Sequence, residues 1–139
     1  MPRILHLITG LHTGGAEVSL LRLVSAMDQE TFPCQVISLI KPGPIGQRIA
    51  DLGIPVHTLN LSRGMPSPLA LLTLVRRIRA FTPDIIQTWL YHADLLGLLA
   101  ASLTRTPVIW NLRCSHMDLA QYRRLKSWTL KACAALSPL

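Results

Sequence analysis

The sequence has no long uninterrupted hydrophobic run. The longest candidate, residues 95–103, falls short of the ~18–20 residues that a membrane-spanning helix needs, and Gly97 and Ser102 interrupt it. The apolar run near the N-terminus is also short and contains His6, which makes it a poor match to a signal peptide. We therefore expect a cytoplasmic protein without a membrane span.

Cysteines are few and are not arranged as metal ligands. There are three, at positions 34, 114 and 133, and none belongs to a C-x-x-C pair. An odd number without metal spacing favours a reduced, cytosolic chain over a disulfide framework. We expect no metal site and no cofactor.

Acidic residues are half as many as basic ones, 7 against 14, so the formal charge is +7. The basic residues form two clusters, Arg76, Arg77 and Arg79, then Arg123, Arg124, Lys126 and Lys131. Aromatic residues make up only 5% and no nucleic-acid motif is present, so we expect no nucleic-acid partner. An anionic membrane surface or a lipid phosphate would suit the clusters, and a solvated helix face would explain them equally well.

What the sequence does contain is a regular alternation of β-rich and helix-periodic segments. Half of the residues are hydrophobic, enough for one domain with a core over 1–139. We expect strands at 4–8, 34–40, 54–59, 85–89 and 107–112, and helices at 16–27, 45–52, 66–81, 93–103 and 119–135. The alternation predicts an α/β, Rossmann-like, doubly wound and mostly parallel sheet of about five strands with helices on both faces. The helix at 93–103 is almost entirely apolar, so we expect it to be deeply buried.

A glycine-containing loop, residues 9–15, joins the first strand to the first helix. Gly14 and Gly15 allow a tight turn and the close approach of a ligand, and the N–H groups that begin the helix favour a phosphate or a sugar. The spacing matches neither the dinucleotide fingerprint nor the P-loop. The alternative is that the glycines only shape a turn.

Several polar side chains follow strands, where ligands of such sheets bind. His12, His92, Arg113 and His116 all fall at predicted carboxyl ends. The segment Tyr91–Asp94 is a candidate lining of the same region, although His92 could instead cap its helix. His6 and His57 lie within strands, and we expect structural roles for them.

Three segments carry a resemblance to a known family. GLHTGGAEVSLLRLV at 10–24, TPDIIQTWLYHADLLGLLAA at 82–101 and TPVIWNLRCSH at 106–116 together resemble the N-terminal domain of family 4 glycosyltransferases, which have the GT-B fold. In that family a G-G-A-E segment lines the cleft between two Rossmann-like domains. The resemblance implies substrate-binding roles for six residues: His12, Thr13, Gly14, Gly15, Tyr91 and His92.

The loop after the fifth strand departs from the family pattern. Many members have a histidine directly after this strand, and Arg113 occupies that position here. An arginine is a fixed cation that suits anions but cannot shuttle a proton. We expect Arg113 to contact an anion or the acceptor, and His116 to take the histidine's place if the loop turns it inward.

The resemblance also implies what this chain lacks. Family members transfer a sugar from a nucleotide-sugar donor with retention of configuration, commonly in polysaccharide or glycolipid synthesis, and their C-terminal domain holds the donor with a pair of glutamates. The chain contains only Glu17 and Glu30, without that spacing. We therefore expect a nucleotide-sugar donor bound by a missing C-terminal domain, a sugar or lipid-linked acceptor, contact with the inner face of the membrane, and no transfer by this chain alone. Two alternatives are a membrane-docking subunit of a split transferase and a truncated remnant without activity.

Overall fold

The computed structural model describes residues 2–61 and 67–111. Within them the strands are β1 (Ile4–Ile8), β2 (Cys34–Ser38), β3 (Val56–Thr58), β4 (Ile85–Trp89) and β5 (Val108–Asn111). The helices are α1 (Gly15–Ala26), α2 (Pro44–Asp51), α3 (Pro68–Phe81) and α4 (Tyr91–Thr104). The predicted strands and the first four predicted helices are all present, with ends that differ by a few residues. The expected helix at 119–135 lies outside the described residues.

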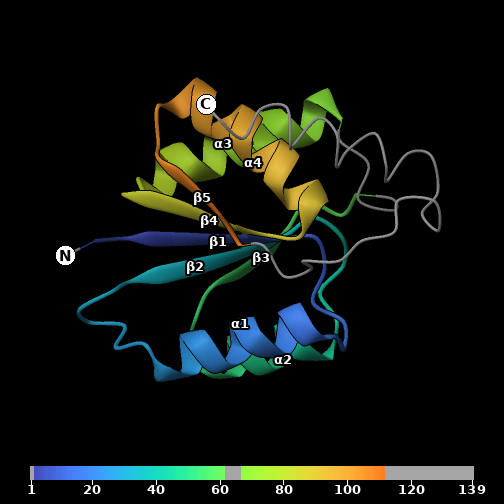
Figure 1. Ribbon diagram of the computed structural model, residues 1–139, viewed down its shortest axis with the longest axis vertical. Helices are drawn as coiled ribbons and strands as arrows, with labels where there is room; N and C mark the ends of the chain where they lie inside the picture. The colour runs from blue at the N-terminus through green and yellow to red at the C-terminus, as the bar shows by residue number, and fades with distance from the viewer. Residues whose placement is uncertain (1, 62–66, 112–139) are drawn as a thin grey trace.

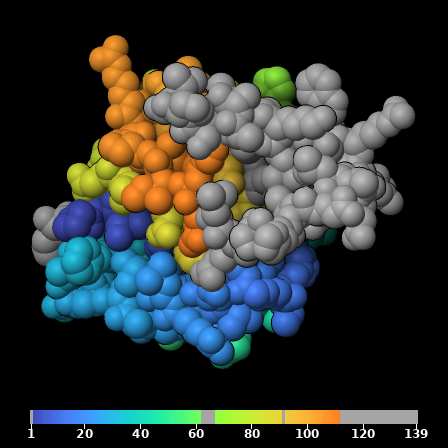
Figure 2. Space-filling model, viewed as in Figure 1, coloured from blue at the N-terminus to red at the C-terminus, as the bar shows by residue number. Residues whose placement is uncertain are grey.

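All strand pairs are parallel, and their order is β3-β2-β1-β4-β5. Figure 1 shows α1 and α2 below the sheet and α3 and α4 above it (Figure 2 shows the same view in space-filling form), and each pair packs together. The α/β, doubly wound, Rossmann-like prediction is therefore confirmed. The order reverses between β1 and β4, so the loops that follow these two strands leave toward opposite faces. This is the switch point, where ligands of open parallel sheets bind.

Alternation along β1 divides the core between the two faces. Leu5 and Leu7 pack toward α3 and α4, whereas Ile8 packs with the residues of α1 and α2. Both sets are buried, as expected for a parallel sheet with helices on both sides.

The expectation that the fourth helix is deeply buried on all sides is wrong. Its buried positions include Ala93, Leu96 and Ala100, yet Leu99 and Leu103 are 42% and 58% exposed. A helix in an outer layer packs on one side only, and its apolar composition did not reveal which side. Among the described residues, no helix is long and apolar enough to cross a membrane.

Candidate functional site

The loop between β1 and α1 is bonded to the loop that follows β2. The Ile40 backbone N–H donates to the Thr9 carbonyl at 3.1 Å, and the Ile45 N–H donates to the Leu11 carbonyl at 3.1 Å. These bonds extend the β1–β2 pairing beyond the strands. The two loops therefore form one connected surface at the carboxyl edge of the sheet.

Gly43 keeps this surface compact. A Cβ there would lie 2.6 Å from the Leu11 carbonyl oxygen and 2.7 Å from the His12 Cα, closer than real side chains come. Any other residue at position 43 would therefore push the first loop away. The sequence alone did not reveal this role of Gly43, because the contact is made with a segment that is distant in the sequence.

Gly14 and Gly15 have no backbone conformation that requires glycine. Gly14 is extended, with φ −166° and ψ 171°, and Gly15 begins α1. A Cβ on Gly14 would meet only the Glu17 carboxylate group, the far end of a flexible side chain, and one on Gly15 would meet nothing within 4 Å. The space beside Gly15 is open, and the first N–H groups of α1 carry the positive end of its dipole.

The side chains of His12 and Thr13 are exposed on this surface, and Gly15 is exposed beside them. The structure thus places four predicted residues, 12–15, together at the carboxyl end of β1. They are available to a ligand at the switch point.

The loop after β4 turns sharply at Leu90. Its φ of 73° and ψ of 153° lie in a region that is essentially restricted to glycine, so this corner is strained. Leu90 is also the N-cap of α4, without a side-chain cap bond, and its carbonyl accepts the Asp94 N–H at 3.0 Å. The predicted Tyr91–Asp94 loop is therefore the first helical turn, and His92 is not the capping residue. Tyr91 and His92 begin α4 on the other side of the switch point.

A buried polar pair secures that corner. The Thr88 hydroxyl donates to the Asp94 carboxylate at 2.5 Å, and both residues are buried, with Asp94 only 4% exposed. Burial raises the pKa of the Asp94 carboxyl to about 6, although the hydrogen bond from Thr88 opposes the rise. The sequence analysis placed Asp94 in the site lining. The sequence held one indication of its burial: Asp94 is the only acidic residue in a mostly apolar helix.

His6 has the structural position that its place in a strand predicted. It is fully buried in the sheet, and the Trp89 indole N–H donates to its Nδ1 at 3.4 Å. Burial lowers the pKa of His6 to about 4, so the ring is neutral at physiological pH. His57, on β3, is half-buried and also has a lowered pKa, mainly through burial and secondly through the charge of Arg77.

The remaining predicted site residues, Arg113 and His116, lie outside the described residues. Within the described ranges, no group of His, Cys, Asp or Glu could hold a metal ion.

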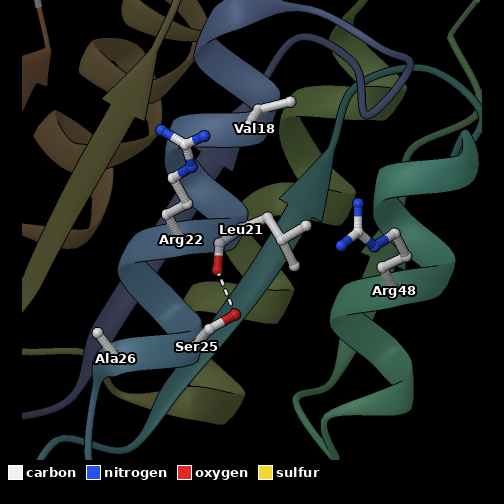
Figure 3. A pocket seen from close by; sticks show the side chains of 6 residues that line it. All are labelled: Val18, Leu21, Arg22, Ser25, Ala26 and Arg48. Atoms are coloured by element: carbon white, nitrogen blue, oxygen red, sulfur yellow. Dashed lines mark hydrogen bonds between the residues drawn. The ribbon is translucent and has the colours of Figure 1, made fainter.

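A shallow hollow of about 450 Å³ lies between α1 and α2, away from the strand ends. Figure 3 shows Arg22 from α1 and Arg48 from α2 at its two sides, with the Ser25 hydroxyl turned inward to the Leu21 carbonyl at 2.6 Å. Both arginines are exposed, and nothing in the described structure aims a buried polar group into the hollow. We therefore place the candidate site at the switch point.

Comparison with solved structures gives the same fold. HepE of Anabaena in complex with UDP-glucose matches with a TM-score of 0.74 at 21% identity, covering 99% of this chain and 35% of that one. HepE in complex with UDP matches with a TM-score of 0.74 at 18% identity, covering 95% and 35%. MurG of Acinetobacter baumannii matches with a TM-score of 0.54 at 21% identity, covering 79% and 33%.

The chain thus spans about a third of the length of these structures. No curated protein matches the sequence. The sequence does match a family description, the glycosyl transferase 4-like domain, over residues 4–137. The parallel Rossmann-like sheet and a match over nearly the whole chain lead to one conclusion: the chain belongs to the glycosyl transferase 4-like family.

Proposed function

We propose that this chain is the N-terminal, acceptor-side part of a retaining glycosyltransferase that moves a sugar from a nucleotide-sugar donor to an acceptor. Family membership supports the reaction class. The observation that carries the site is the open backbone at Gly15, beside exposed His12 and Thr13 at the switch point. A glycine with nothing near it and no demanding backbone angle leaves space that a ligand can use.

The donor is held by a second domain in this proposal. The matched structures are about three times as long as this chain, and two were obtained with UDP or UDP-glucose. The chain would then form one wall of the site, with His12, Thr13, Gly14 and Gly15 on one side of the switch point and Tyr91 and His92 on the other. Arg113, as a contact for an anion or the acceptor, and His116, in the place of the family's histidine, are the proposed catalytic residues.

The acceptor in this proposal is a sugar or a lipid-linked sugar, as in the synthesis of a cell-surface polysaccharide or glycolipid. The protein would act in the cytoplasm, at the inner face of the membrane. The basic character of the chain supports this placement, since its formal charge is +7.

Gly15→Val tests the site with little effect on the fold. The added side chain would project into open space at the start of α1, so the thermal midpoint should change little. The substitution should nevertheless reduce turnover at least tenfold, which corresponds to about 1.4 kcal/mol of lost transition-state binding. The measurement is release of nucleoside diphosphate from a panel of nucleotide sugars by the full-length native protein, with extracted lipids and polysaccharides as acceptors.

Gln47→Val, on the exposed side of α2, is the matched control and should retain wild-type turnover. Equal turnover by the Gly15 and Gln47 variants would overturn the proposed site. If no nucleotide sugar is consumed by the full-length protein under any condition, the proposed reaction fails.

A further inference from the structure

The outer face of α3 carries leucines that take no part in the core. Leu69, Leu72 and Arg76 follow one another at i, i+3 and i+7, so they share one stripe of the helix. Leu69 is 73% exposed and Leu72 is 47% exposed, whereas the residues of the opposite stripe, Ala70, Leu74, Val75 and Ile78, are buried. The two leucines therefore face away from the sheet.

The outer face of α4 repeats this arrangement. On its inner side α4 packs closely against the sheet at Gly97, where a Cβ would lie 2.5 Å from the Thr88 Cγ2. On the other side, Leu99 and Leu103 are exposed. Figure 1 shows α3 and α4 side by side in one layer on one face of the sheet. The four leucines lie on exposed positions of these two helices. We call the set Leu69, Leu72, Leu99 and Leu103 the leucine face.

Basic side chains accompany the leucine face. Arg76, Arg77 and Arg79 are exposed on α3, and Arg105 is exposed at the end of α4. Helix α3 has no acidic residue, and the only one on α4, Asp94, is buried. Asp84, near Arg79 and Arg105, accepts the Arg3 backbone N–H at 2.7 Å. In the described part of the chain, the layer therefore combines apolar side chains with a net positive charge, because four arginines outnumber the one exposed carboxylate near them.

Exposed leucines next to arginines indicate what kind of partner this surface would bind. A second copy of the same face would bring arginines against arginines, and nucleic acid would gain nothing from the leucines. A bilayer that contains anionic lipids complements both features, because leucines enter the boundary between headgroups and acyl chains while arginines contact lipid phosphates.

We propose that the outer faces of α3 and α4 dock on an anionic lipid bilayer through the leucine face and its arginines. Leu69 and Leu72 lie at the start of α3, which follows the carboxyl end of β3, so docking places the bilayer beside the end of the sheet that carries the candidate site. The inference deepens the membrane contact proposed above and rests on it, but it does not require sugar transfer.

Vesicle co-sedimentation of the full-length native protein tests the proposal. The protein should sediment with vesicles of phosphatidylcholine and phosphatidylglycerol and remain in solution with phosphatidylcholine alone. Replacing Leu69 and Leu72 together by serine should weaken binding by about tenfold or more, and Arg76→Glu should weaken it by at least about fivefold. Added salt should weaken wild-type binding as well.

The matched control replaces Leu23 and Leu52, exposed leucines of the other helical layer, by serine, and should bind as the wild type does. If both double variants lose vesicle binding to the same extent, the leucine face is not the surface that contacts the bilayer. Absence of binding to anionic vesicles, or a leucine-dependent dimer in sedimentation velocity, would also overturn the proposal. Nucleotide release in detergent reports separately on the transferase, so the two proposals can fail independently.

Discussion

At the scale of single residues, two buried titratable groups respond to acid in opposite directions. The pKa of Asp94 is raised to about 6, so the folded state holds this proton more tightly than the unfolded chain does. Its contribution to stability is present at low pH and is lost as the pH rises from 3.8 to about 6. The pKa of His6 is lowered to about 4, so its contribution is present at neutral pH and is lost as the pH falls from 6.5 to about 4.

The substitution Asp94→Asn should expose the effect of His6 on the pH dependence of stability. The amide oxygen can still accept the Thr88 hydroxyl, but the carboxyl titration disappears. The free energy of unfolding should then fall on acidification between pH 6.5 and about 4, by on the order of 2 kcal/mol more than in the wild type. Urea unfolding across this pH range is the measurement. An Asp94→Asn profile that parallels the wild-type profile would contradict the assignment.

The sequence predicted the positions of these residues better than their environments. His6 was recognised as structural because it lies in a strand, and His12 and His92 fell at strand ends as expected. The burial of Asp94 was not predicted. Its hydrogen-bond partner Thr88 lies on β4, and no pattern in the sequence indicates that this strand and the start of α4 share a buried hydrogen bond.

At the scale of elements, the contact of α4 with the sheet depends on Gly97 and Thr88. A Cβ at position 97 would lie 2.5 Å from the Thr88 Cγ2 and 3.2 Å from the Leu7 Cδ2. Thr88 cannot easily rotate away, because its hydroxyl is bonded to Asp94. The helix would have to move outward or lose that bond.

Gly97→Ala should therefore destabilise the fold by roughly 1–3 kcal/mol, the usual cost of overpacking. Thr88→Ser removes the obstructing methyl group and keeps the hydroxyl, so the double variant should recover most of the loss. Thermal unfolding of the four proteins in a double-mutant cycle measures the coupling. Additive effects of the two substitutions would show that the contact is not the cause.

Element types were predictable, and their outer surfaces were not. Hydrophobic periodicity located all five described strands and α1 to α4, because each must bury one side or both. Helix α4 has leucines on both its exposed and its buried side, so its composition does not show which side faces the sheet. The close approach at Gly43 depends on a loop far away in the sequence, and no local pattern could predict it.

At the scale of the whole molecule, the parallel sheet provides one wall of the proposed site. Sugar transfer needs donor and acceptor held together, and a single wall cannot fix their relative positions. The purified 139-residue chain should therefore show no appreciable transfer from UDP-glucose or other nucleotide sugars. A radiolabelled-sugar transfer assay, with an intact two-domain glycosyltransferase as positive control, is the measurement. Transfer by the short chain would refute the proposed division of labour.

The bonds between the first two loops have a consequence for engineering this protein. Leu11 and His12 lie against Gly43, and the Leu11 carbonyl accepts the Ile45 backbone N–H, so the position of the first loop depends on a distant segment of the sequence. Libraries that vary residues 41–43 would shift the presentation of His12 without changing any side chain that faces a ligand. Directed evolution of acceptor preference could therefore begin in the second loop and leave the first loop's own residues intact.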